Sequence, residues 1–246
     1  MIIDFHTHMF PDKIAGRTLD YLSGIFGASP FADGTYTGLC NSMGKGAVDI
    51  SIALPAVTKV SQVASINRFA SAYTEGPVIS FGGIHPECEN YKEILKEIKN
   101  LGLKGIKLHP DYQDMYFDNI RYERIIDAAS ELGLITVVHA GVDPKCPEDV
   151  HCTPKMARKV LDDVKPEKLV LAHMGGNEMW DDVERYLVGQ NVYFDTGVIL
   201  NTMPQEQFLR IVHMHGADRI LFGTDSPWDG QEEGILGVQS LALEDK

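Results

Sequence analysis

Two histidines near the N-terminus, His6 and His8, stand one residue apart at the end of a short apolar run. The residues before them, Met1-Ile2-Ile3, predict a β-strand. Side chains alternate between the two faces of a strand, so both imidazoles should point the same way. Neutral imidazoles are good ligands for zinc and similar divalent metals. The pair therefore predicts half of a metal site, although one satisfied and one exposed histidine would also explain it.

Along the whole chain, short apolar runs rich in β-branched residues alternate with helical patterns. These strands and helices are the elements that could position the histidine pair. Strands are predicted at residues 2–6, 49–54, 78–84, 105–108, 135–139, 169–173, 192–195 and 219–223. Helices are predicted at residues 61–73, 91–101, 122–132, 154–164, 181–188 and 205–215, with an extra helical piece at 14–22 in a long first loop. Such alternation implies parallel strands and right-handed crossovers. We expect one α/β domain over residues 1–246, a TIM-type (β/α)8 barrel with a short or missing last helix.

Ionisable residues gather at the carboxyl ends of these predicted strands, which is where parallel barrels place their active sites. A structural role can explain any one of them. Buried, unpaired histidines and carboxylates are costly, however, so the whole set indicates one polar site. In chain order the residues are His6 and His8, His85, Lys107 and His109, His139, His173, Asp195 and Asp225.

The composition, with 44% hydrophobic and 23% charged residues in 246, is that of an ordinary globular protein. A net charge of −13 argues against nucleic acid as a partner, because its backbone requires basic contacts. No apolar run is long enough for a membrane span and no signal peptide is evident, so a cytoplasmic location is expected. The four cysteines lack Cys-x-x-Cys spacing and are interpreted as free thiols.

The His-x-His pair, the later strand-end histidines and the final aspartate together resemble the amidohydrolase superfamily over nearly the whole chain. Three segments narrow the resemblance: Gly-Ile-Lys-Leu-His-Pro at 105–110, Ala-His-Met-Gly-Gly at 172–176 and Gly-Thr-Asp-Ser-Pro-Trp at 223–228. They are similar to the amidohydrolase-related branch. That branch includes aminocarboxymuconate-semialdehyde decarboxylase-like and resorcylate decarboxylase-like enzymes.

The resemblance implies a role for each strand-end residue. His6, His8, His139 and Asp225 match the metal ligands, and zinc is the expected ion. Asp225 and His173 match the residues that move protons or polarise the substrate. A divalent ion lowers the pKa of bound water to roughly 7, and a carboxylate can accept the proton that this water loses. In two-metal relatives a carboxylated lysine and a histidine hold the second ion, which here would be Lys107 and His173.

Other residues are assigned to substrate binding or to support. Lys107, if unmodified, would bind a substrate carboxylate, while His109, His85 and Trp228 would line the pocket, although a packing role explains each of these three. Asp4 shares the face of His6 and is a candidate to orient a ligand. The loop 142–151 should form a pocket wall. The nearby Cys146, His151 and Cys152 fit no standard zinc spacing, and His213 and His215 are placed on the surface or in a helix C-terminal turn.

The leading interpretation is a metal-dependent hydrolase of a small-molecule amide, ester or lactone. The first alternative is a metal-dependent, non-oxidative decarboxylase of an aromatic or unsaturated carboxylate. A TatD-type deoxyribonuclease is disfavoured, because those relatives carry a glutamate where this chain has Lys107 and His109. An inactive barrel that serves as a binding module is disfavoured by the intact ligand set. Relatives often form dimers, so a homodimer is an additional expectation.

Overall fold

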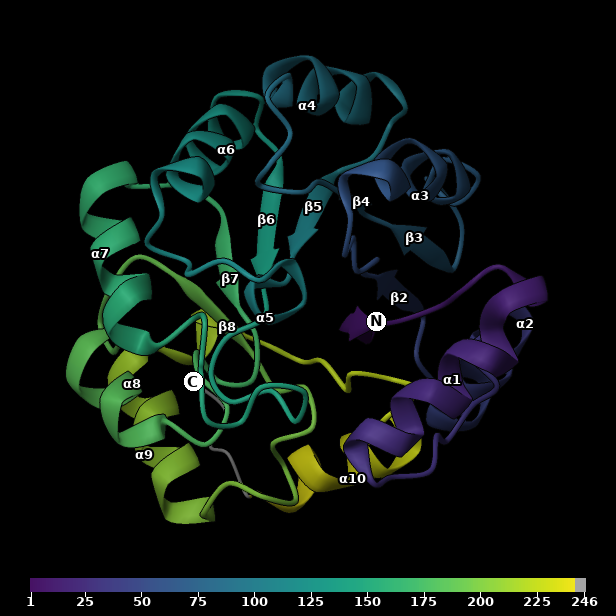
Figure 1. The fold of residues 1–246 in the computed structure, drawn as a ribbon. Helices are drawn as coiled ribbons and strands as arrows, with labels where there is room; N and C mark the ends of the chain where they lie inside the picture. The colour runs from purple at the N-terminus through teal and green to yellow at the C-terminus, as the bar shows by residue number, and fades with distance from the viewer. Residues whose placement is uncertain (242–246) are drawn as a thin grey trace.

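Parallel strands surrounded by helices make up the computed structural model, which describes residues 1–241 (Figure 1). The strands in chain order are β1 (Ile3–Thr7), β2 (Ile50–Ala53), β3 (Val78–Ser80), β4 (Gly82–Gly83), β5 (Gly105–Leu108), β6 (Ile135–Val138), β7 (Leu169–Leu171), β8 (Tyr193–Asp195) and β9 (Ile220–Leu221). They pair in sequence order as a three-stranded sheet, β1 to β3, and a six-stranded sheet, β4 to β9. The parallel α/β alternation predicted from the sequence is confirmed.

The strand expected at residues 78–84 is interrupted at Phe81, which separates β3 from β4. Phe81 N still donates to Ala53 O at 2.9 Å, so the chain stays beside β2 at this point. At Gly83 the side-chain amide of Asn67 takes the place of a neighbouring strand. It accepts from Gly83 N at 2.8 Å and donates to Gly83 O at 3.0 Å. The break between the two sheets is therefore bridged by a side chain.

The other gap lies between β1 and the segment that follows β9. Phe5 N donates to Phe222 O at 2.8 Å, and Asp225 N donates to His6 O at 2.7 Å. An isolated parallel bridge joins Thr7 to Ser226. These bonds bring the first strand and residues 222–226 together, so His6 and Asp225 lie side by side.

Ten α-helices are described, and α3, α4, α6, α7, α8 and α9 follow one another around the outside of the strands (Figure 1). The helix α7 begins as predicted, because Thr153 accepts a hydrogen bond from Met156 N and Pro154 occupies the first turn. The long first loop holds two helices, α1 and α2, and the last helix, α10, is present with ten residues. Residues 242–246 of the predicted domain lie outside the described part. The helices are α1 (Asp12–Phe26), α2 (Tyr36–Gly46), α3 (Val63–Ala70), α4 (Tyr91–Asn100), α5 (Pro110–Gln113), α6 (Ile120–Glu131), α7 (Pro154–Val164), α8 (Trp180–Tyr186), α9 (Gln205–His215) and α10 (Gln231–Ser240).

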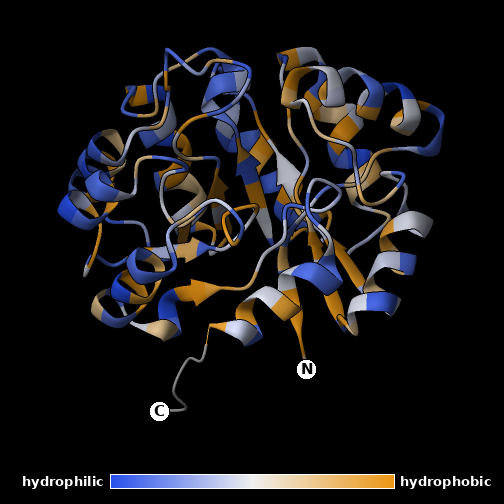
Figure 2. Ribbon diagram, turned by 90° about the horizontal axis from the view of Figure 1, so that it is seen from below, coloured by the Kyte–Doolittle hydropathy of each residue, from blue (hydrophilic) through white to orange (hydrophobic). Residues whose placement is uncertain are grey.

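Hydrophobic residues cover the strands and the inner helix faces, while the outward helix faces are mostly hydrophilic (Figure 2). On α4, for example, Leu95 and Ile98 are fully buried and the lysines between and beside them face outward. A separate cluster consists of strand residues and their neighbours, among them Ile52, Val137 and Val170. These apolar residues lie earlier in the strands than the polar strand ends, so the polar residues stand on a hydrophobic layer of the core. No helix in the described part is long and apolar enough to cross a membrane.

Candidate metal centre

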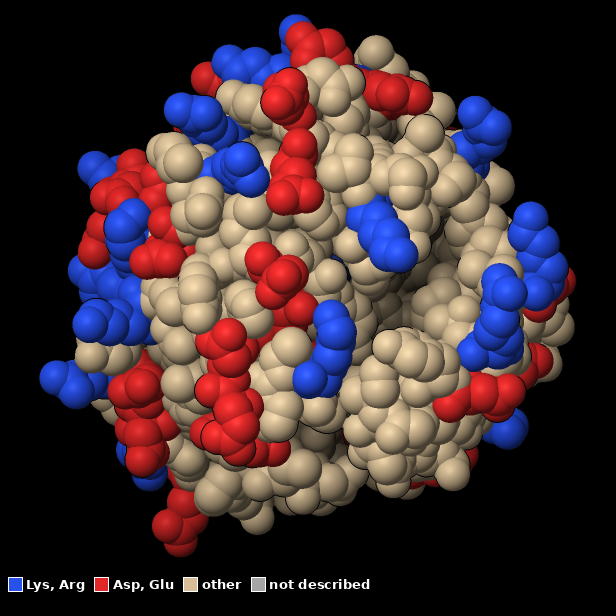
Figure 3. Space-filling model, viewed as in Figure 1, with Lys and Arg blue, Asp and Glu red and all other residues tan. Residues whose placement is uncertain are grey.

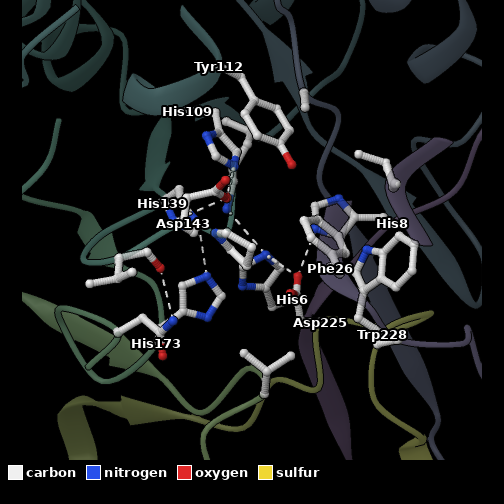
Figure 4. A pocket seen from close by; sticks show the side chains of 18 of the residues that line it. His6, His8, Phe26, His109, Tyr112, His139, Asp143, His173, Asp225 and Trp228 are labelled. Atoms are coloured by element: carbon white, nitrogen blue, oxygen red, sulfur yellow. Dashed lines mark hydrogen bonds and ion pairs between the residues drawn. The ribbon is translucent and has the colours of Figure 1, made fainter. Parts of the chain in front are cut away.

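The carboxyl ends of the strands surround a cavity of about 370 Å³. The face that carries it is visibly hollowed in Figure 3, and Figure 4 shows its side chains from close by. Most of the site residues predicted from the sequence meet here, whereas His85 is not among the lining residues. Those that do line the cavity are His6, His8, Lys107, His109, His139, His173, Asp225 and Trp228.

One carboxylate oxygen joins the first two histidines. Asp225 Oδ1 lies 3.0 Å from His6 Nε2 and 2.8 Å from His8 Nε2. Burial alone would raise the pKa of Asp225, but His6 and His8 hold it well below its usual range. The three donor atoms lie within 4.8 Å of one another. Two imidazole nitrogens and one carboxylate oxygen are a suitable partial ligand set for zinc, manganese or a similar ion.

The hydrogen bond made by His8 Nδ1 determines which nitrogen of this ring is free to bind a cation. His8 Nδ1 lies 2.7 Å from Leu54 O. A carbonyl only accepts, so Nδ1 carries the proton. Burial lowers the pKa of His8, which favours the neutral ring. Its Nε2 then presents a lone pair to the ionised carboxylate of Asp225, and two acceptors this close require a cation or a proton between them.

On the far side of His6 lies Asp195, a residue that the sequence placed at a strand end without assigning it a role. Asp195 Oδ2 is 2.9 Å from His6 Nδ1, and both side chains are buried. Burial and the Lys107 ammonium disfavour a charged His6, but Asp195 and Asp225 outweigh them and raise its pKa to about 9. In the absence of metal, His6 is therefore the imidazole in this cavity that most readily holds a proton.

His139 was expected to join His6, His8 and Asp225 as a fourth ligand. The structure places it in the same cavity but against His173, with 3.0 Å between His139 Nδ1 and His173 Nε2. The ring of His173 stacks on that of His6, with the ring centroids 5.3 Å apart. His139 and His6 thus both contact His173.

The contact between His139 and His173 is a hydrogen bond or a pair of facing lone pairs, depending on which nitrogen of His139 carries the proton. His173 Nδ1 lies 3.0 Å from Gly197 O and must carry the proton, which leaves Nε2 as an acceptor. His139 Nε2 has no hydrogen-bond partner, but lies 3.7 Å from Asp143 Oδ2 and 3.9 Å from Asp111 Oδ2. If Nε2 carries the proton toward these carboxylates, Nδ1 is also bare. A cation between the two rings would satisfy both.

Lys107 reaches the first group of histidines through His6. Its Nζ is 3.2 Å from His6 Nε2, and the side chain is 1% exposed. Burial lowers the pKa of Lys107 to about 8, with Asp195 and Asp225 acting in the opposite direction. A buried ammonium in this position can bind a substrate carboxylate.

Aromatic side chains line the cavity at two places, beside His109 and beside Trp228. Tyr112 stacks on His109 with 3.8 Å between ring centroids, and His109 stacks on His139 at 4.2 Å. Phe26, from α1, meets Trp228 edge to face at 4.6 Å. Trp228 and His109 line the cavity as predicted. Tyr112 and Phe26 were not predicted, because both lie outside the strand-end pattern that the sequence analysis used.

Asp4 and the loop 142–151 were expected to support the site. Asp4 contacts no imidazole, since its carboxylate binds Thr224 Oγ1 at 2.6 Å, Gln231 Nε2 at 2.8 Å and the backbone N–H groups of His6 and Thr224. Burial raises its pKa to about 6, although these hydrogen bonds oppose the shift. The wall expected from loop 142–151 is partly formed by Val142, Asp143 and Pro144.

The remaining histidines lie apart from the cavity. His151 Nδ1 is 3.2 Å from Asp111 Oδ1, and among the described residues it forms no metal cluster with Cys146 or Cys152. His85 Nδ1 accepts from Glu87 N at 3.3 Å. On α9, His213 is exposed as expected, whereas His215, in the last turn, is buried.

Comparisons with known proteins place this geometry among related folds. The sequence profile of the amidohydrolase family matches residues 3–246. No curated protein matches the chain. An uncharacterised TIM-barrel protein from Bordetella bronchiseptica gives a TM-score of 0.74 at 20% identity, covering 99% of this chain and 92% of that one.

Two solved decarboxylases are similarly close in fold. A 2,6-dihydroxybenzoate decarboxylase from Rhizobium gives a TM-score of 0.74 at 14% identity, covering 99% of this chain and 93% of that one. A dihydroxybenzoic acid decarboxylase from Polaromonas, solved with manganese and 2-nitroresorcinol, gives 0.71 at 14% identity, covering 99% and 92%. Identities this low show similarity of fold, and the predicted TIM-type barrel is thereby confirmed.

Proposed function

Since this chain belongs to the amidohydrolase family, we propose that it is a metal-dependent, non-oxidative decarboxylase of an aromatic or unsaturated carboxylate. The supporting observation is the lining of the cavity, in which imidazoles and Lys107 occur together with the aromatic rings of Tyr112, Phe26 and Trp228. A flat, conjugated acid matches both the polar and the aromatic residues. The names of the two decarboxylases with a similar fold agree with this choice.

His6, His8 and Asp225 would hold a divalent cation in this proposal. The sequence favours zinc, and the Polaromonas relative contains manganese; nitrogen and carboxylate donors suit both. When bound, the cation would polarise a substrate oxygen and offset negative charge. His139 and His173 offer a second position, either as additional ligands or, together with a carboxylated Lys107, as the site of a second ion.

The residues around the cation would transfer the proton and bind the substrate. Decarboxylation replaces a C–C bond with a C–H bond, so each turnover releases CO2 and consumes one proton. Asp225 and His173, which both line the cavity, are the groups proposed to hold that proton and pass it to the substrate carbon. The Lys107 ammonium would bind the carboxylate, and the aromatic rings of Tyr112, Phe26 and Trp228 would pack against the substrate.

Hydrolysis of a small-molecule amide, ester or lactone is the second candidate. It is supported by the position of Asp225 in the cavity, because a carboxylate there can accept a proton from water. The two reactions differ in their products: decarboxylation releases CO2, whereas hydrolysis consumes water and releases none.

The test uses purified protein loaded with Mn2+ or Zn2+ and two substrate panels. One panel holds hydroxybenzoates and unsaturated carboxylates, and the other holds lactones, esters and amides. CO2 release from the first panel, lost in the His6→Ala/His8→Ala double variant, is the expected result. Turnover of the second panel alone would replace the decarboxylase proposal with the hydrolase. Absence of any bound divalent ion would contradict both.

A further inference from the structure

Asp195, at the end of β8, has no exposed surface and uses both carboxylate oxygens. Oδ2 lies 2.9 Å from His6 Nδ1. Oδ1 accepts two backbone hydrogen bonds, from His173 N and from Gly197 N, each at 3.0 Å. One carboxylate thus contacts a side chain of the first histidine pair and the backbone that carries His173.

The contact with His6 fixes which ring nitrogen faces the cavity as a lone pair. An ionised carboxylate only accepts hydrogen bonds, so His6 Nδ1 must carry a proton. In the neutral ring, Nε2 is then bare, and it is Nε2 that lies 3.0 Å from Asp225 Oδ1. Asp195 therefore selects the tautomer of His6 that can bind a cation beside Asp225.

The contact with the backbone fixes His173. His173 and Met174 have φ angles of 58° and 54°, in the left-handed region that non-glycine residues disfavour. Asp195 Oδ1 holds the N–H of His173, and Asp195 O accepts from Met174 N at 2.7 Å. Gly197, held by the same Oδ1, uses its carbonyl to accept from His173 Nδ1. The tautomer of His173 is set through this chain of bonds.

We propose that Asp195 is a positioning residue that orients His6 and His173 together, so that both present bare Nε2 atoms to the cavity. This inference rests on the proposed cation site at His6, His8 and Asp225. Asp195 is absent from the residues that line the cavity, and it contacts His6 through Nδ1, whereas Asp225 contacts Nε2 of the same ring.

An isosteric substitution separates this role from simple packing. In Asp195→Asn the amide oxygen can still accept from His173 N and Gly197 N. The amide NH2 group then faces His6 Nδ1 and favours the other tautomer, whose Nε2 carries the proton. The fold should persist while the cation ligand is lost. Asp195→Ala removes both effects and should also lower the melting temperature.

Cation affinity is measured by chelator competition with Mn2+ on folded protein, alongside the melting temperature of the metal-free form. We expect Asp195→Asn to weaken Mn2+ binding by about 10- to 100-fold, the range typical for loss of a carboxylate behind a metal-binding histidine. The melting temperature of this variant should stay near that of the wild type. Mn2+ binding by Asp195→Asn as tight as in the wild type would overturn the proposal. It would also be overturned if the loss of Mn2+ binding were fully explained by the fraction of the variant that is unfolded.

Asp4→Asn is the matched control, because Asp4 is equally buried but contacts no imidazole. It should lower stability and leave Mn2+ affinity per folded molecule unchanged. Equal weakening in both variants would assign the effect to general disruption and overturn the proposal. Mn2+ binding that depends on Asp195 without CO2 release would refute the decarboxylase and leave the positioning role standing. Wild-type protein that binds no divalent ion would refute both.

Discussion

His8 Nε2 lies 2.8 Å from Asp225 Oδ1 although His8 already donates its other ring proton to the carbonyl of Leu54. The protein thus holds two acceptors against each other at the cavity surface, each with 15% of its side chain exposed. This arrangement is unfavourable without positive charge between the two atoms. A bound cation removes the conflict, and several measurable consequences depend on it.

The first consequence concerns metal content. The His6→Ala/His8→Ala double variant should lose most of its divalent ion, because it lacks two of the three clustered donors. Metal analysis of purified protein would show about one or two ions per chain in the wild type and little in the variant. His213→Ala is the control, since His213 is an exposed histidine on α9. Equal content in the wild type and the double variant would contradict the ligand assignment.

The second consequence concerns stability. A ligand that binds only the folded state stabilises it by about 2.7 kcal/mol when its free concentration is 100 times its dissociation constant. Added Mn2+ or Zn2+ should therefore raise the free energy of unfolding, measured by denaturant titration of the metal-free protein. The gain should vanish in the double histidine variant. An equal gain in both proteins would place the stabilising ion elsewhere.

A third prediction concerns the buried ammonium of Lys107. Lys107→Gln should reduce kcat/KM for carboxylate substrates by about 10- to 150-fold, the equivalent of a charged hydrogen bond worth about 1.5–3 kcal/mol. The control is Lys96→Gln, because Lys96 is exposed on α4. Retained activity toward carboxylates in Lys107→Gln would exclude a substrate-binding role for the amine.

The fourth prediction concerns His215 and acid. Gly189 N donates to His215 Nδ1 at 3.0 Å, and Nε2 lies 2.9 Å from Val192 O, so the folded state holds the neutral ring. Burial lowers the pKa of His215 below its ordinary value of 6.5. The unfolded chain therefore binds the proton more tightly, and this contribution to stability is present above pH 6.5 and is lost as the pH falls below it.

Chemical denaturation of wild type and His215→Gln across this range measures the effect. The wild type should lose stability faster on acidification, by at most about 1.4 kcal/mol per pH unit, because only one proton is involved. Identical slopes for the two proteins would show that His215 titrates alike in the folded and unfolded states.

The strand-end histidines and Asp225 could be found from sequence because a parallel barrel delivers alternate residues to one rim. The contacts made by those side chains required coordinates. His139 is the clearest case: it was expected as a metal ligand with His6 and His8, and it lines the same cavity, but only the coordinates show that its Nδ1 faces His173. Spacing identifies the rim but not the direction in which an imidazole turns within it.

Residues of the loops and of the first helix were harder to predict. Phe26 belongs to α1, whose predicted extent of 14–22 was shorter than the observed Asp12–Phe26, so its last turn was assigned to a loop. Tyr112 lies on the short helix α5, which was not predicted. Asp195 was noticed, but its two-sided bonding depends on His6 and His173, which only the tertiary fold brings beside it.

The hydrogen bonds between β1 and residues 222–226 join the two ends of the barrel and bring His8 and Asp225 together. His8 and Asp225 are separated by 217 positions in the chain. During synthesis, His6 and His8 cannot contact Asp225 until nearly the entire barrel has been made and β1 has paired with residues 222–226. Tight metal binding would then require a nearly complete chain. A chain that ends before residue 225 has the His-x-His pair but lacks the carboxylate of Asp225.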